Sequence, residues 1–126
     1  MSKVIINTDE APEPIGPCSQ SVLANDTLYI SGQIPLDPDT GQLVTNSIEN
    51  ETERVMKNIG KILRAAGFSF DHVVKCSIFV KDLENFAKIN EVYGRYFDVA
   101  PPARETVEVS RLPKDVNVEI SCIAVK

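Results

Sequence analysis

Apolar side chains recur every three or four positions between Asn46 and Gly67, which is the spacing of one face of a helix. The stripe consists of Ile48, Thr52, Val55, Met56, Ile59, Ile62, Leu63 and Ala66. Asn46 is placed to cap the N-terminus with Glu49 three residues later, as in a capping box, and Gly67 ends the helix. Glu53 and Lys57 on the polar side have the spacing of an ion pair. The pattern predicts an amphipathic helix packed on an apolar layer.

A second apolar stripe at helical spacing follows Asp82, which is placed to cap it. The stripe consists of Leu83, Phe86, Ile89, Tyr93 and Phe97, and the sequence Ala-Pro-Pro at 100–102 ends it. Inside the first helix, Gly60 costs roughly 1 kcal/mol relative to alanine, which predicts close packing at that position.

Short β-branched or alternating runs predict the strands. They cover residues 4–6, 19–23, 27–31, 73–80, 104–109 and 116–125. Asn25-Asp26 joins the second and third runs as a hairpin turn, and the run at 73–80 is apolar enough to be mostly buried on both faces. The element order is β-β-β-α-β-α-β-β.

This order predicts an α+β two-layer sandwich, with a mixed sheet and both helices on one of its faces. The other face of the sheet then has no cover within one chain. Since the strands carry apolar residues on both faces, we expect the chain to form an oligomer.

Composition narrows the classes of function. The chain has 126 residues and 13.9 kDa, which predicts one domain over 1–126. A net charge of −5 with no basic tract disfavours a dedicated nucleic-acid binder and an anionic membrane surface as partners.

The cysteines and the histidine limit which disulfides, metal sites and catalytic triads the chain can form. Cys18, Cys76 and Cys122 are odd in number and form no C-x-x-C pair, and the first residues lack a signal-peptide pattern. We therefore expect free thiols and a cytoplasmic location. His72 is the one histidine, so a multi-histidine metal site is excluded, and a zinc site would need all three cysteines to converge on it. A Ser-His-Asp triad would have to pass through His72, which directly precedes a strand.

Two charged side chains occupy positions that suit catalysis. Alternation along the last strand places Glu119 on the face opposite the helices, which we expect an oligomer to cover. A carboxylate buried there needs a hydrogen-bonding or charged partner, or a function. Arg104 follows a rigid proline entry, and its guanidinium suits a two-pronged grip on a carboxylate. The structural alternatives are an exposed position for Glu119, and for Arg104 an ordinary salt bridge to Glu119 or Glu108.

The segment after the third strand, Ser31-Gly32-Gln33-Ile34-Pro35, offers a hydroxyl at Ser31 and a close backbone approach at Gly32. Taken alone it indicates a bulge or a turn. Residues 111–115 indicate a charged loop between strands.

Several motifs together resemble the Rid/YjgF family, the reactive-intermediate deaminases, over nearly the whole chain. They are Ala11-Pro12, Ile15-Gly16-Pro17, Ser31 to Pro35, Val74-Lys75, Phe79-Val80-Lys81-Asp82-Leu83, Asn90, Tyr93, Phe97, Pro102-Ala103-Arg104, Val107-Glu108-Val109, Arg111 to Asp115 and Val118-Glu119-Ile120. Because it keeps Arg104, the chain is most similar to the branch of the family that contains the 2-imino acid deaminases.

The resemblance implies a homotrimer of chorismate-mutase-like subunits, with the sheets facing inward and active clefts between neighbours. It also implies hydrolysis of small enamines or imines such as 2-aminoacrylate, released by pyridoxal-phosphate enzymes, to 2-keto acids and ammonia without metal or cofactor. Arg104 would hold the substrate carboxylate, and Glu119 would orient water and move protons. Ser31, with backbone groups near Gly32 and Thr106, would hold the amine or the tetrahedral centre. Asn90 and Phe86 would line the cleft.

The chain departs from the family pattern at three positions. Cys18, which we expect near the cleft as a substrate-binding residue, stands where the family usually has tyrosine. Glu105 and Thr106 stand where the family has a small residue and often cysteine. Glu105 either competes for the Arg104 guanidinium or, as alternation indicates, points away from it.

Cys18 and Glu105 favour the alternative of a non-catalytic, metabolite-binding trimer. RNA cleavage or translation inhibition is a further alternative, which the net charge and the single histidine disfavour. Chaperone-like activity is not tested by the sequence.

Overall fold

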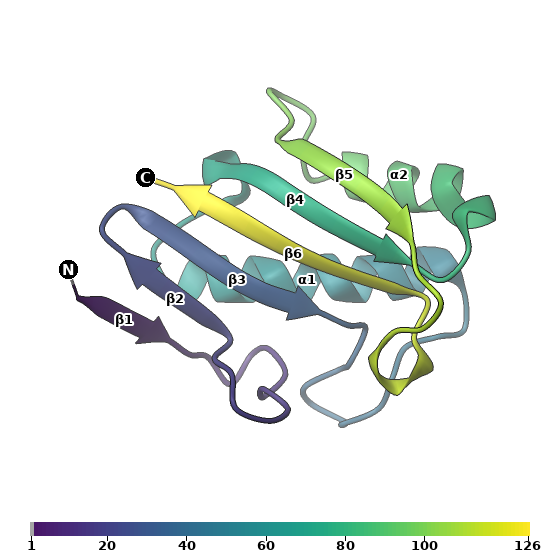
Figure 1. Ribbon diagram of the computed structural model, residues 1–126, viewed down its shortest axis with the longest axis horizontal. Helices are drawn as coiled ribbons and strands as arrows, with labels where there is room; N and C mark the ends of the chain where they lie inside the picture. The colour runs from purple at the N-terminus through teal and green to yellow at the C-terminus, as the bar shows by residue number, and fades with distance from the viewer. Residues whose placement is uncertain (1) are drawn as a thin grey trace.

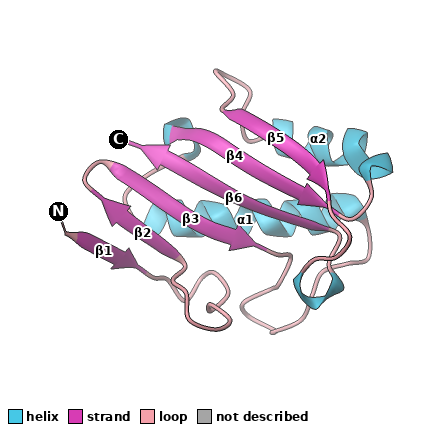
Figure 2. Ribbon diagram, viewed as in Figure 1, coloured by secondary structure: helices cyan, strands magenta, loops and turns pink. Residues whose placement is uncertain are grey.

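A computed structural model describes residues 2–126. It contains one six-stranded sheet in the order β1-β2-β3-β6-β4-β5. The strands are β1 (Lys3–Ile6), β2 (Ser21–Ala24), β3 (Thr27–Gln33), β4 (Val73–Val80), β5 (Ala103–Glu108) and β6 (Val118–Val125). β4 and β5 are parallel and all other neighbours are antiparallel, so the sheet is mixed. The helices α1 (Ile48–Ala65) and α2 (Phe86–Gly94) both lie behind the sheet in Figure 1, which leaves its near face open. The predicted element order and the two-layer α+β class are confirmed, as the colouring by secondary structure makes plain (Figure 2).

Helix α1 buries the predicted apolar stripe, but its cap differs from the prediction. Ser47 rather than Asn46 is the cap, and its hydroxyl accepts a hydrogen bond from the Asn50 amide at 3.1 Å. The one-residue shift removes the capping box, because the third helical residue is then Asn50 and not Glu49. The C-terminal stop is confirmed, since Gly67 has a φ of 79°, which favours glycine.

The predicted Glu53–Lys57 ion pair is wrong. The Tyr96 hydroxyl donates a hydrogen bond to the Glu53 carboxylate instead. The close packing predicted at Gly60 is confirmed, because a Cβ there would lie 3.0 Å from the Phe70 ring.

Helix α2 begins after a 3-10 turn, Leu83–Asn85, that Asp82 caps by accepting a hydrogen bond from the Glu84 amide. It ends at Gly94, earlier than predicted, because the following amides turn back to carbonyls three residues before them. Phe97 nevertheless remains buried in the core.

The two faces of the sheet differ sharply. On β6 the helix-facing side chains are Val118, Ile120, Cys122 and Ala124, all essentially buried, as predicted. The opposite face carries half-buried and exposed side chains, among them Tyr29, Val107 and Val125. The prediction that β4 is mostly buried on both faces is therefore wrong for a single subunit, because nothing in residues 2–126 covers the second face.

The cysteines are all free. Cys76 on β4 and Cys122 on β6 are register partners, and their Sγ atoms lie 3.3 Å apart, whereas Cys18 is exposed in a loop. His72 Nδ1 accepts a hydrogen bond from the Ser69 amide and so caps a turn before β4. No cluster of His, Cys, Asp and Glu suited to a metal ion occurs between residues 2 and 126, and no helix in that range is long and apolar enough to cross a membrane.

Candidate active site

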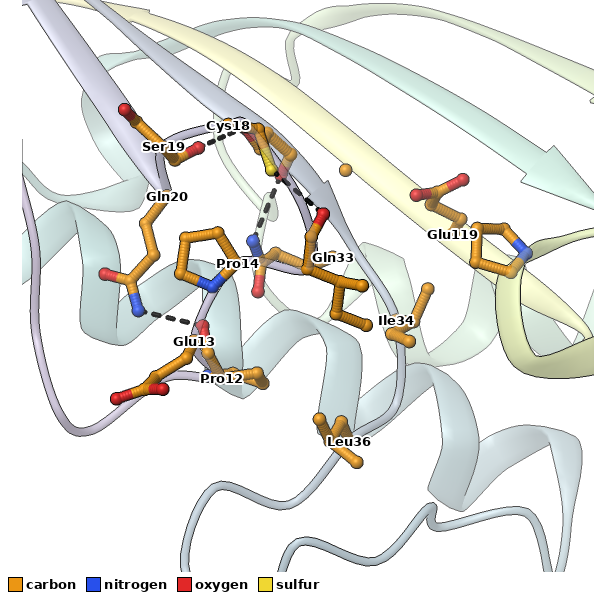
Figure 3. A pocket seen from close by; sticks show the side chains of 14 residues that line it. Pro12, Glu13, Pro14, Cys18, Ser19, Gln20, Gln33, Ile34, Leu36 and Glu119 are labelled. Atoms are coloured by element: carbon orange, nitrogen blue, oxygen red, sulfur yellow. Dashed lines mark hydrogen bonds between the residues drawn. The ribbon is translucent and has the colours of Figure 1, made fainter.

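A cavity of about 260 Å³ opens where β3 ends and β6 begins. Its walls come from the loop before β2, from the segment after β3, and from Pro113 and Glu119 (Figure 3). The lining residues are Pro12, Glu13, Pro14, Ile15, Cys18, Ser19, Gln20, Ser31, Gly32, Gln33, Ile34, Leu36, Pro113 and Glu119. Among the residues of the sequence prediction, the structure brings Cys18, Ser31, Gly32 and Glu119 together here.

Gln20 fixes the loop that forms one wall. This side chain is buried, and its Nε2 donates to the carbonyls of Thr8, Ala11 and Pro12. Its Oε1 accepts a hydrogen bond from the Thr8 amide. Because one buried amide satisfies several loop groups, the wall is held at a set distance from the sheet.

Ser31 and Gly32 lie at an irregularity of the β3–β6 pairing, where the register shifts between Ile30 and Gln33. The predicted alternative of a bulge is thus correct, and a bulge is a common way to redirect side chains next to a site. The Ser31 hydroxyl donates to the Ser19 carbonyl, so its oxygen is left to accept a hydrogen bond from a ligand.

Glu119 lies directly against Gly32. A Cβ at position 32 would be 2.5 Å from Glu119 Oε2, so only glycine leaves room for the carboxylate in this position. No cation or hydrogen-bond donor among residues 2–126 pairs with the carboxylate, and burial raises the pKa of Glu119 above its ordinary value of 4.5. An unpaired, partly desolvated carboxylate is well suited to accept a proton.

Cys18 lies across the cavity from Glu119 (Figure 3). Its thiol donates to the Ile15 carbonyl at 3.4 Å, within its own turn. The cavity mouth therefore presents a small side chain at the position where the resemblance leads us to expect a phenol.

Arg104 lies elsewhere. Its guanidinium carbon lies 4.9 Å from the centre of the Tyr93 ring and 5.4 Å from that of Phe86, both on α2. Both are cation–π distances. The alternatives of a salt bridge to Glu119 or to Glu108 are wrong, since the Glu108 carboxylate accepts from the Leu83 amide. Within residues 2–126 no carboxylate pairs with Arg104, so its donors are free for a ligand.

Buried polar atoms without a partner gather on the elements around Arg104. Within the described chain they are Asn90 Oδ1, Tyr93 OH and Thr106 Oγ1. Thr106 follows Arg104 on the same face of β5, and Asn90 lies one turn from Phe86 on α2. Buried polar groups are normally satisfied, so three orphans beside a free guanidinium indicate a place for a polar ligand. Tyr93 was not among the predicted site residues. It belongs to the predicted apolar stripe and to the family motifs, and no local signal distinguishes its hydroxyl from that of a core tyrosine.

Glu105 points away from Arg104, as alternation predicts. Its carboxylate accepts from the Ser77 hydroxyl and pairs with Lys75 at 2.9 Å. These two contacts lower the pKa of Glu105, and the alternative of competition for Arg104 is wrong.

The candidate residues thus form two groups on opposite faces of the sheet. Arg104 is the register partner of Cys76 and faces the helices, whereas Glu119 is the partner of Phe79 and faces the open side. We call the first group, Phe86, Asn90, Tyr93, Arg104 and Thr106, the arginine group. The second, Cys18, Ser31, Gly32 and Glu119, is the glutamate group. One subunit does not bring the two groups together.

The chain is similar to known proteins both in sequence and in fold. A family model described as Endoribonuclease L-PSP matches residues 8–126. A solved structure of the Rid-family protein YyfA from Yersinia pestis superposes with a TM-score of 0.96 at 48% identity, covering 99% of this chain and 100% of that one. The chain belongs to the Rid family.

Other Rid-family relatives carry names that differ in detail. A RutC family protein of Pyrococcus horikoshii is 52% identical over 98% of both chains. A mouse relative named 2-iminobutanoate/2-iminopropanoate deaminase is 45% identical over 97% of this chain and 90% of its own. The structure of Escherichia coli TdcF with bound serine has a TM-score of 0.94 at 41% identity, covering 98% of each chain.

Proposed function

We propose that this Rid-family chain is an enzyme that hydrolyses small 2-imino acids, and their enamine tautomers, to 2-keto acids and ammonia. The observation that carries the proposal is the pair of groups with opposite chemistry. The arginine group holds an unpaired guanidinium suited to a carboxylate, and the glutamate group holds an unpaired carboxylate suited to the nitrogen and water end. A 2-imino acid presents both ends on adjacent carbon atoms. The name of the mouse relative supports the same substrate class.

The complete site is formed between copies of the chain in a homotrimer whose sheets face inward. The open sheet face, with its half-buried apolar side chains, supports this arrangement, because such a face needs a cover. Because Arg104 and Thr106 lie on the edge strand β5, the arginine group is at the rim of its sheet, where it can meet the glutamate group of the neighbouring copy. The small substrate bridges the two.

The residues account for each proton in the reaction. Arg104 holds the substrate carboxylate through two parallel hydrogen bonds. As a water oxygen bonds to the imine carbon, Glu119 takes one water proton and passes it to the imine nitrogen, which becomes an amine. Glu119 then takes the proton of the new hydroxyl group and passes it to the amine, so that the carbon–nitrogen bond breaks and ammonia leaves with a 2-keto acid formed. The Ser31 oxygen accepts a hydrogen bond from the nitrogen and orients it.

A metabolite-binding trimer without catalysis is the second candidate. Cys18 at the cavity mouth and the bound serine of TdcF favour it. RNA cleavage, which the family model's description names, has less support, because the one histidine caps a turn and the net charge is −5.

The test couples the purified protein to a dehydratase that generates 2-aminoacrylate and follows the decay of the imine. A faster decay of the imine is expected. Saturable binding of serine without a faster decay would instead favour the metabolite-binding trimer without catalysis. Faster cleavage of RNA with no effect on the imine would replace both.

Mixing two inactive variants tests the shared site. Arg104→Ala and Glu119→Gln subunits, refolded together in equal amounts, should recover about a quarter of the wild-type rate, because each mixed ring contains one intact pair. No recovery from a mixed trimer would place the whole site within one subunit.

A further inference from the structure

Helix α1 buries two polar side chains that neither the apolar stripe nor the proposed reaction uses. Glu51 is 1% exposed and Asn58 is 0% exposed, and the two lie seven residues, two helical turns, apart on one side of α1. Burying a carboxylate without a cation is costly unless hydrogen bonds compensate for lost water. Within residues 2–126 no cation pairs with Glu51.

Glu51 binds the segment that leads into β6. Its two carboxylate oxygens accept from the backbone amide of Asn117 at 2.6 Å and from the side-chain amide of the same residue at 2.9 Å. Asn117 also accepts from the Lys81 amide through its carbonyl, so it is fixed between α1 and the end of β4. Glu119 follows two residues later.

The segment held by Glu51 does not adopt its shape easily. Lys114 and Asp115 have φ angles of 55° and 57°, a region that non-glycine residues rarely occupy. The same turn supplies Pro113 to the wall of the cavity. A bond that fixes Asn117 therefore fixes both the turn and the start of β6.

Asn58 binds the facing wall. Its side-chain amide donates to the carbonyls of Ile34 and Leu36 at 3.1 and 3.0 Å, and both residues line the cavity. Arg54, one turn earlier, donates to the Asn58 oxygen and fixes its orientation. Ile34 directly follows β3, whose bulge carries Gly32.

We propose that Glu51 and Asn58 are positioning residues, which hold the β3 wall and the β6 wall of the cavity at a fixed separation from one rigid helix. Glu119 is thereby kept against Gly32, in reach of a substrate. The inference rests on the proposed function for its kinetic consequence, but the positioning itself is measurable without any reaction.

The kinetic test uses Glu51→Leu and Asn58→Leu in the full chain, with Thr52→Val as the matched control. Thr52 is equally buried on α1, but its hydroxyl bonds only to the Ile48 carbonyl of its own helix. Each positioning variant should lose about tenfold to a hundredfold in kcat with KM nearly unchanged, since misplacement of about 1 Å costs that much. Thr52→Val should keep kcat per folded subunit even where its Tm falls. Equal kcat losses in all three variants would reduce Glu51 and Asn58 to general stability and overturn the proposal.

Conservative rescue and coupling sharpen the test. Glu51→Gln keeps an acceptor for the Asn117 amide, and the Asn117 side chain can rotate to accept from the new amide, so its kcat should stay within about threefold of wild type. In a Glu119→Gln background, Glu51→Leu should cause no further loss, because its effect runs through Glu119. A full additional loss in that background would refute the positioning role.

Two measurements that need no enzymatic activity, NMR titration and hydrogen exchange, separate this inference from the proposed function. Carbon-13 NMR titration should find the Glu119 pKa above 4.5 in the wild type and closer to 4.5 in Glu51→Leu, where the carboxylate moves toward water. Hydrogen exchange should show loss of protection at the Asn117 amide with the α1 core unchanged. If the wild type lacks deaminase activity but these shifts occur, the positioning stands and the proposed function fails. If activity is present and neither shift occurs, the positioning fails alone.

Discussion

Gly32→Ala is the sharpest perturbation of the proposed site, because the change is a single methyl group. The backbone of Gly32 lies outside the left-handed region, so alanine fits its conformation. The new Cβ, however, would lie 2.5 Å from Glu119 Oε2 and 2.8 Å from its carboxyl carbon. What yields is the end of a flexible side chain, and the free energy of unfolding should change by less than about 1 kcal/mol.

The rate should respond far more strongly than the stability. Ordinary contact begins at 3.4 Å, so the carboxylate must retreat by about 0.9 Å, and a misplacement of that order costs about a hundredfold in rate. The assay is imine decay in the coupled dehydratase reaction, with Tm measured on the same sample.

Gly94→Ala is the matched control, because a Cβ at Gly94 meets nothing within 4 Å and its φ is not left-handed. It should keep the wild-type rate. A Gly32→Ala protein with wild-type kcat and an intact Tm would refute the reasoning, since the position of Glu119 would then not determine the rate.

Three further perturbations address the other site residues. Arg104→Ala should lower kcat/KM tenfold to a hundredfold, as for loss of about 1.5–3 kcal/mol of charged hydrogen bonding, and Arg104→Lys should not restore it; wild-type turnover in either folded trimer would contradict the proposed grip. Because the folded-state pKa of Glu119 is raised, the free energy of unfolding falls as pH rises through that pKa. Glu119→Gln should therefore lose kcat yet match or exceed the wild-type Tm at pH 7, and calorimetry should show this difference in Tm closing as the pH is lowered toward 4.5. A Tm below wild type at pH 7 would contradict this. Cys18→Tyr should preserve or raise the rate of imine decay, and an inactive but assembled variant would show that Cys18 is misplaced in our proposal.

Local patterns predicted most of the fold. The stripe of α1 and the faces of β6 follow from periodicities of 3.6 and 2, which depend on few distant contacts. The errors at Ser47 and Gly94 are boundary shifts, because neighbouring residues compete as caps and stops. The exposure of the second face of β4 depends on what packs against that face, and the sequence of the strand itself carries no information about this.

The candidate site was less accessible to sequence, because its chemistry depends on partners far apart in the chain. The alternative of a salt bridge from Arg104 to Glu119 or Glu108 is wrong, because α2 supplies aromatic rings to the guanidinium. Glu51 is polar and lies in a helical first turn, so nothing local distinguishes it from the half-buried glutamates around it. Only its contact with Asn117, 66 residues away, makes it a buried anchor.

The position of β6 has a consequence for how the molecule is made. β6 follows every other strand in the chain, yet it lies in the middle of the sheet, between β3 and β4 (Figure 1). During synthesis the β1–β3 unit and the β4–β5 pair therefore each wait with an open edge, and long-range pairing of this kind is slow and prone to aggregation. The strand that joins them also delivers Glu119. A nascent chain thus completes its sheet and gains its proposed proton acceptor in the same step, so a precursor without β6 carries at most the arginine group.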